Sequence, residues 1–217
     1  MLEDNYRHKG LRKKLLSELS EKGITDTRVL EAMNKVPRHF FLSSAFLEFA
    51  YENKAFQIGA GQTISQPFTV AFQSQLLKIE KGMKVLEVGT GSGYQTAVLC
   101  EMGAKVYSIE RQKLLHDNAK SLLMKMGYRP NLVYGDGYKG LPSFAPFDRI
   151  LITCAAPSIP DELLLQMKRD GLLVIPFGEG EVQEMMVIHE DEHGHFQSEV
   201  HGKFSFVPML EKRNSQH

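Results

Sequence analysis

The sequence predicts an α/β protein with a doubly wound, mostly parallel sheet, N-terminal helices and an antiparallel C-terminal edge. Short β-rich runs alternate with helical stretches at 84–89, 105–110, 131–136, 148–154 and 171–178. This alternation is typical of parallel strands joined by crossover helices. Three further strand-like runs follow without an intervening helix, at 185–190, 195–200 and 203–209. We therefore expect the last part of the sheet to be antiparallel.

The first 36 residues predict two helices. Leu11, Leu15 and Leu19 fall on one helical face. A second apolar stretch follows two candidate N-caps, Thr25 and Asp26, and ends before Pro37. We expect three segments: a helical appendage at 1–60, the core at 61–210 and a loose tail at 211–217.

Composition limits the classes of function. The 26 basic and 26 acidic side chains cancel among 217 residues, so we expect no general attraction for nucleic acid or for anionic membranes. No apolar run approaches the roughly 20 residues of a membrane helix, and the first residues are too charged for a signal-peptide core. We expect a cytoplasmic monomer with one main core.

A glycine-rich junction, LEVGTGSGYQTAVL, carries the main functional signal. An apolar strand runs into Gly89, Gly91 and Gly93 before a helix resumes. Glycines let the backbone approach a ligand, and the following helix N-terminus offers unpaired N–H groups. Glu110 ends the next strand, 21 residues after Gly89 (110 − 89), where an acid accepts hydrogen bonds from ribose hydroxyls. A purely structural turn is the alternative.

The third strand ends in Gly135, Asp136 and Gly137, at the sheet edge where open α/β sheets bind ligands. Asp136 either caps a turn or contacts the amino group of adenine. A dinucleotide fingerprint requires a further glycine where Tyr94 stands. The pattern offers one acid for ribose and one for adenine, and it lacks the glycine turn that binds a pyrophosphate. This combination favours S-adenosylmethionine as the cofactor.

The segment GQTISQP at 61–67 precedes this cofactor signature and fits neither the helices nor the sheet. One hypothesis is a linker that ends in a helix cap before Pro67. The other gives Ser65 a functional role.

Metal and thiol chemistry have weak support. Cys100 and Cys154 lie in apolar runs without a CxxC partner, so we expect inert, reduced thiols. The histidines near the C-terminus have neither paired cysteines nor HExxH spacing, and we predict no metal site.

The chain resembles the protein-L-isoaspartate O-methyltransferases, which are class I, Rossmann-like, S-adenosylmethionine-dependent enzymes. The resemblance spans 36–210 and rests on VPRHFF, GQTISQPFTVA, VLEVGTGSGYQTAVL, GDGYKG, APFDRILITCAAP, GLLVIPFG and FVPM. GQTISQP ahead of the glycine turn is specific to this family. Phe68 departs from it, because bacterial relatives commonly carry Tyr there and others carry His.

The resemblance implies a protein repair methyltransferase that methylates the free α-carboxylate of L-isoaspartyl, and of D-aspartyl, residues in damaged proteins and peptides. It leaves S-adenosylhomocysteine as the product. Ser65 would contact the substrate carboxylate as the catalytic residue, with Gln66 and the main-chain carbonyl of Val207 as further substrate contacts. The implied cofactor-binding residues are Thr63, Ile64, Glu87, Gly89, Thr90, Gly91, Ser92, Gly93, Glu110, Arg111, Gly135, Asp136 and Gly137.

Two other hypotheses also explain the glycine turn and the two acids, Glu110 and Asp136. One is a class I methyltransferase for a different small molecule or protein site, which leaves GQTISQP and FVPM unexplained. The other is a cofactor-binding module without catalysis, which the intact Ser65 disfavours.

Overall fold

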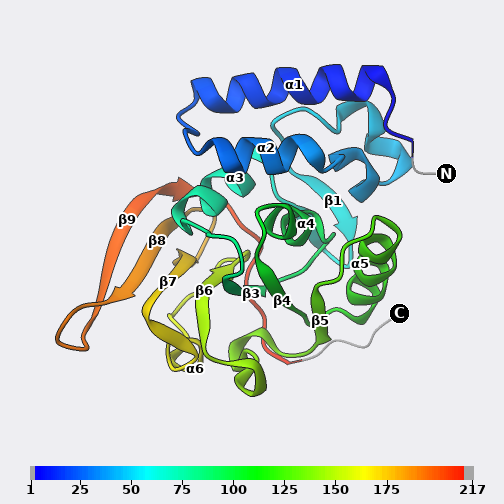
Figure 1. Ribbon diagram of the computed structural model, residues 1–217. Helices are drawn as coiled ribbons and strands as arrows, with labels where there is room; N and C mark the ends of the chain where they lie inside the picture. The colour runs from blue at the N-terminus through cyan, green and yellow to red at the C-terminus, as the bar shows by residue number, and fades with distance from the viewer. Residues whose placement is uncertain (1–2, 213–217) are drawn as a thin grey trace.

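The computed structural model describes residues 3–212. The strands of its main sheet are β3 (Lys84–Val88), β4 (Lys105–Glu110), β5 (Asn131–Tyr134), β6 (Phe147–Ile152), β7 (Met167–Phe177), β8 (Gln183–Glu190) and β9 (Phe196–Phe204). Their order across the sheet is β5-β4-β3-β6-β7-β8-β9. The pairs from β5 to β7 are parallel, and β8 and β9 are antiparallel. The predicted fold class is therefore confirmed (Figure 1).

Helices accompany the sheet on both sides in the order α1 (Tyr6–Glu21), α2 (Thr27–Lys35), α3 (Pro67–Leu76), α4 (Tyr94–Glu101), α5 (Lys113–Lys125) and α6 (Asp161–Leu164). Short 3-10 turns are η1 (Arg38–Phe41), η2 (Ser44–Phe49), η3 (Gly137–Lys139) and η4 (Pro142–Phe144). The crossover from β5 to β6 contains only η3 and η4, and the one from β6 to β7 only the four-residue α6. The expected alternation with full helices thus holds for the earlier strands alone.

The central strands are buried on both faces. Successive side chains of a strand point to opposite faces of the sheet, so each strand contributes to two apolar clusters. In β6, Ile150 and Ile152 belong to one apolar cluster, and Leu151 between them belongs to another. Leu173 and Val174 of β7 divide in the same way. Continuous apolar runs therefore fill two layers of core.

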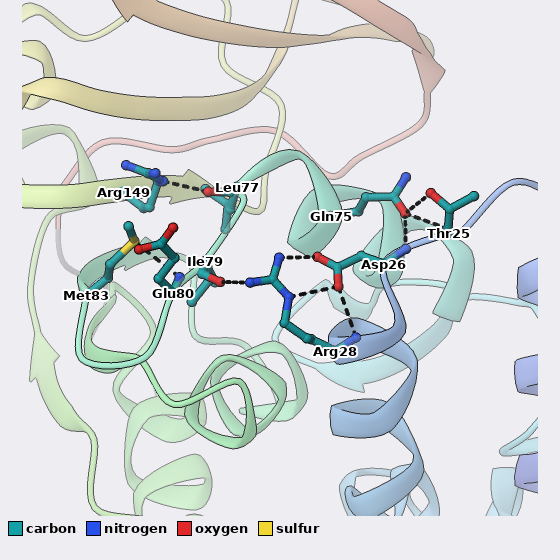
Figure 2. Close-up of polar contacts among 9 residues, drawn as sticks. All are labelled: Thr25, Asp26, Arg28, Gln75, Leu77, Ile79, Glu80, Met83 and Arg149. Atoms are coloured by element: carbon teal, nitrogen blue, oxygen red, sulfur yellow. Dashed lines mark hydrogen bonds and ion pairs between the residues drawn. The ribbon is translucent and has the colours of Figure 1, made fainter.

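The helices α1 and α2 lie side by side at one end of the molecule (Figure 1). Asp26 caps α2 by accepting a hydrogen bond from Arg28 N at 3.0 Å, as predicted. Gln75 Oε1 of α3 accepts from Thr25 N at 2.7 Å and from Asp26 N at 2.9 Å. Arg28 also donates to the carbonyl of Ile79 at 2.9 Å. These contacts fix the start of α2 to the core (Figure 2).

A hairpin of β1 (Phe56–Gly59) and β2 (Gln62–Ile64) stands where the first hypothesis placed a linker, and it crosses the expected boundary between residues 60 and 61. Its two loop residues, Ala60 and Gly61, have φ values of 50° and 67°. Two positive φ angles in a two-residue loop match a type I′ turn. In GQTISQP, Gly61 therefore belongs to the turn, Gln62–Ile64 form β2, and Ser65 and Gln66 connect β2 to the start of α3 at Pro67.

The C-terminal segment corrects another expectation. One strand, β9, contains residues 196–200 of the first run and only residues 203–204 of the second, because the chain leaves the sheet after Phe204. Val207 O then accepts from Ala155 N at 2.8 Å, and Met209 N donates to Ala155 O at 2.6 Å. The segment is bound to the end of β6, and Pro208 has no N–H for a sheet ladder.

Glu211 and Lys212 accept hydrogen bonds from Arg111 through their carbonyls, at 3.4 and 2.9 Å. The remainder of the expected loose tail, 213–217, lies outside the described residues. None of the helices in the described part of the chain has the length and apolar character needed to cross a membrane.

Candidate active site

The glycine turn joins β3 to α4, and two of its glycines, Gly89 and Gly93, are packed too closely for a side chain. Gly89, Gly91 and Gly93 have φ values of 99°, 54° and 87°, which side chains rarely tolerate. A Cβ atom at Gly89 would collide with Thr153 Oγ1, and one at Gly93 would press on Leu123 of α5 at 3.1 Å. The turn therefore combines close backbone approach with tight packing of the helix behind it.

Glu110 ends β4 directly beside this turn. Its Oε2 accepts from Gly91 N at 2.9 Å, and its Oε1 accepts from Gln112 N at 2.8 Å. The residue is 5% exposed, and this burial raises the pKa of its carboxyl group while the backbone N–H donors oppose the rise. Each oxygen keeps a lone pair for a ligand hydroxyl.

A first cavity opens at the carboxyl ends of β3, β4 and β6. Its lining includes Gly89, Gly91, Glu110, Arg111 and Gly137, together with Thr63 of β2. Sequence reasoning missed several other lining residues, namely Ile109, Thr153, Cys154, Met209 and Leu210. Burial raises the pKa of the Cys154 thiol to about 12, in keeping with the expected inert cysteine.

Asp136 does not line this cavity, although its neighbour Gly137 does. Its Oδ1 accepts from Tyr138 N at 3.1 Å and caps η3, and its Oδ2 accepts from Lys212 N at 3.2 Å. The capping role is therefore present, and the contact with adenine stays a prediction. Gly135 packs against Ile109, which a Cβ atom would approach to 2.8 Å.

Two further cavities meet the first one. The second, of about 450 Å³, is lined by Ser65, Gln66, Phe68, Phe206 and Val207, among others. The third lies behind the glycine turn, where Ser65, Ile64, Thr90, Ser92 and Gln95 contribute to its wall.

Thr63 and Thr153 line all three cavities, and Ser65 lines the second and third. Thr153 Oγ1 donates to the carbonyl of Gly89 at 2.7 Å. Ser65 therefore lies where the third cavity, at the glycine turn, meets the second cavity, at the C-terminal segment. Thr153 follows β6, the sheet neighbour of β3, so only the strand order reveals its proximity.

Ser65 does not cap α3. The N-cap residue is Gln66, without a side-chain hydrogen bond, and Phe68 N is bonded instead to Asn53 Oδ1 at 2.9 Å. The carbonyl of Ser65 accepts from Arg38 Nη1 at 2.9 Å. Arg38 belongs to the VPRHFF segment, to which the sequence assigned no individual role.

Glu87 is fully buried beneath the turn and lines none of these three cavities. Thr96 Oγ1 donates to its Oε2, and its Oε1 has no hydrogen-bond partner. Burial raises the pKa of the carboxyl group to about 7. The structure thus places Glu87 beneath the turn that lines the first and third cavities.

One cluster outside this site brings metal-ligating atoms together. Asp4, His8 and His39 have such atoms within 4.8 Å of one another. Arg12 donates to both carboxylate oxygens of Asp4, at 3.0 and 2.8 Å. The ring nitrogens of His39 lie 2.8 Å from Tyr51 Oη and 3.0 Å from the carbonyl oxygen of residue 3. These contacts form a hydrogen-bond network that anchors the start of α1.

Solved structures share this architecture. A structure described as a protein-L-isoaspartate O-methyltransferase superposes with a TM-score of 0.81 at 27% identity, covering 91% of this chain and 65% of its own. The chain thus spans about two thirds of that protein. A putative protein-L-isoaspartate O-methyltransferase from Plasmodium falciparum, in complex with S-adenosyl-L-homocysteine, has a TM-score of 0.80. It covers 92% of this chain and 98% of its own at 23% identity, and so supports the fold alone.

Sequence comparisons agree over nearly the full length. A protein-L-isoaspartate O-methyltransferase from Christiangramia forsetii is 56% identical over 98% of this chain and 100% of its own. One from Flavobacterium johnsoniae is 55% identical with the same coverage. Residues 10–214 match the family model described as Protein-L-isoaspartate(D-aspartate) O-methyltransferase. The chain therefore belongs to the protein-L-isoaspartate(D-aspartate) O-methyltransferase family.

Proposed function

We propose that the protein transfers a methyl group from S-adenosylmethionine to the free α-carboxylate of L-isoaspartyl residues, and of D-aspartyl residues, in damaged proteins and peptides. The observation that carries the proposal is the position of Ser65 between the cavities at the glycine turn and the cavity near the C-terminal segment. Family membership and the relatives named protein-L-isoaspartate O-methyltransferase support it.

The residues present fit this cofactor. Gly89 and Gly91 line the first cavity without a side chain, so the main chain of the turn faces a bound ligand. Glu110 offers carboxylate lone pairs suited to ribose hydroxyls, and Ile109 and Met209 add apolar lining suited to a purine ring. Gln95 Oε1, in the wall of the third cavity, is a buried acceptor without a partner.

When bound, S-adenosylmethionine supplies a sulfonium methyl group that a nucleophile can attack. A carboxylate with an ordinary pKa of about 4 is already ionised at neutral pH, so the protein needs no general base. Its task is alignment and the exclusion of water. We assign to the Ser65 hydroxyl the task of holding one carboxylate oxygen, which leaves the other free to react.

A neutral donor suits this task. A strong cation bonded to the carboxylate would stabilise a charge that disappears in the transition state. Arg38 contacts Ser65 only through the main-chain carbonyl. We assign Gln66 and Val207 to the peptide, because both line the second cavity. Val207 O already accepts from Ala155 N, so a peptide N–H would use its second lone pair.

We further propose that the protein acts as a cytoplasmic monomer without nucleic acid, in keeping with its balanced charge. The segments 1–60, 61–210 and 211–217 remain our proposed organisation.

A radiolabel transfer assay tests the activity. An isoaspartyl peptide should accept methyl groups from S-adenosylmethionine, and the same peptide with a normal aspartyl residue should accept almost none. Equal labelling of the two peptides would contradict the proposed substrate. Calorimetric binding of NAD, with no binding of S-adenosylhomocysteine, would contradict the cofactor.

A further inference from the structure

Gln95 presents a buried acceptor to the third cavity. It is the second residue of α4, is 7% exposed and lines the space behind the glycine turn. Its Nε2 donates to Ser74 Oγ of α3 at 2.9 Å, which fixes the amide plane. Its Oε1 is buried and has no hydrogen-bond partner. Buried acceptors are nearly always paired, so this oxygen calls for a donor from a ligand or from water.

Three polar groups around this cavity already have partners within the protein. Gln73 Nε2 donates to Ile152 O at 3.0 Å, and Thr90 Oγ1 is bonded to Ser108 Oγ at 2.6 Å. The carbonyl of Gly89 accepts from Thr153 Oγ1. No aspartate or glutamate lines the cavity, among the residues that the structure describes. An ammonium group in this space would therefore depend on a neutral acceptor.

We propose that Gln95 Oε1 binds the α-ammonium group at the methionine end of the cofactor. This inference rests on the proposed function, because it assumes that the cofactor spans from the Glu110 cavity to the cavity of Gln95. The two cavities share Thr63, Gly89, Gly91 and Thr153, so one elongated ligand can reach both. Ser74 acts as a positioning residue that holds the amide.

The affinities for three ligands distinguish the contact between Gln95 and the amino group from cofactor binding in general. S-adenosylhomocysteine has the amino group, a deamino analogue lacks only that group, and methylthioadenosine lacks the whole amino acid end. We expect the wild type to bind S-adenosylhomocysteine at least about 10-fold more tightly than the deamino analogue, the effect of one hydrogen bond to a charged group. In Gln95→Leu this preference should disappear, while affinity for methylthioadenosine stays at the wild-type value. Calorimetry measures all three dissociation constants.

Gln166→Leu is the matched control, because Gln166 is an equally buried glutamine that is bonded to the main chain near α6 and η3 and does not line the third cavity. It should lower the melting temperature and leave the preference for the amino group intact. Gln95→Glu is the second variant should Gln95→Leu fail to fold, and it should keep or increase that preference.

An unchanged amino-group preference in a folded Gln95→Leu would overturn the inference. A second result would also overturn it: Gln95→Leu keeps the preference for the amino group but no longer binds S-adenosylhomocysteine more tightly than decarboxylated S-adenosylhomocysteine. The Gln95 amide would then face the cavity with its N–H group and bind the cofactor carboxylate. Failure of the wild type to bind any of these ligands would instead contradict the proposed function itself.

Discussion

Arg38 Nη1 donates a hydrogen bond to the main-chain carbonyl of Ser65 at 2.9 Å. The same guanidinium donates to the carbonyls of Ala50 and Lys54, both at 3.0 Å, and lies over the ring of Tyr94. Arg38 is fully buried, and burial lowers its pKa to about 10, which leaves it charged at neutral pH. Arg38 therefore connects the loop after η2 to Ser65 and acts as a positioning residue.

Arg38→Lys should lower kcat/KM for an isoaspartyl peptide. A single ammonium group cannot match the planar fork that reaches three carbonyls, so the Ser65 carbonyl loses its fixed partner. We expect a decrease of about 10-fold or more, the effect of one hydrogen bond to a charged group. The affinity for S-adenosylhomocysteine should change little, because Arg38 does not line the Glu110 cavity. Kinetics on folded protein and calorimetry measure the two quantities.

Arg12→Lys is the control for this experiment. Arg12 is also buried, but its partners are Asp4 and Tyr51, away from Ser65. It should lower the melting temperature with normal kcat/KM per folded molecule. If both variants lose only stability, Arg38 does not position Ser65.

Ser65→Ala should lower kcat/KM about 10- to 150-fold and leave cofactor binding nearly intact. The melting temperature should stay close to the wild-type value, because Ser65 does not cap α3. Steady-state kinetics and thermal denaturation on one preparation give both numbers. Earlier melting combined with wild-type turnover would show a structural serine and contradict the catalytic assignment.

Glu110→Ala should weaken binding of S-adenosylhomocysteine about 10- to 150-fold. The variant loses the carboxylate expected at the ribose and also releases Gly91 N from the turn. Calorimetry measures the dissociation constant. Asp117→Ala removes an exposed acid on α5 that is paired with Lys113 and should bind normally. Wild-type affinity in a folded Glu110→Ala would mean that another residue binds the ribose.

The sequence predicted those parts of the site that depend on local pattern. A strand followed by three glycines and a helix identifies the turn, and the spacing to Glu110 follows from the length of one crossover. Arg38, Thr153 and Gln95 could not be found this way. Their partners Ser65, Gly89 and Ser74 lie 27, 64 and 21 positions away in the chain. Such contacts depend on strand order and helix docking, which no local period encodes.

The β1–β2 hairpin was missed for a different reason. A two-residue type I′ loop is usually recognised by Asn-Gly or Asp-Gly, whereas this loop is Ala60-Gly61. Alanine rarely adopts a positive φ, so the sequence did not indicate a hairpin turn at this position. The two strands have only four and three residues, which is too short for a clear alternation of apolar and polar side chains to indicate a hairpin.

Glu87→Gln should change how stability depends on pH. Burial raises the pKa of Glu87 from its ordinary 4.5 to about 7 in the folded protein. Because the folded value lies above the unfolded one, the contribution of Glu87 is complete below about pH 4.5 and is lost as pH rises through about 7. The shift corresponds to about 3 kcal/mol of unfolding free energy.

Urea denaturation of the ligand-free protein at several pH values measures this effect. The free energy of unfolding of the wild type should fall relative to Glu87→Gln as pH rises from about 4.5 to above 7, because glutamine keeps an acceptor for Thr96 without a titrating proton. Taking the difference between the two proteins removes the contribution of every other titrating group. Parallel curves across this range would mean that Glu87 does not hold its proton in the folded state, and the assignment of a protonated carboxyl beneath the glycine turn would then be wrong.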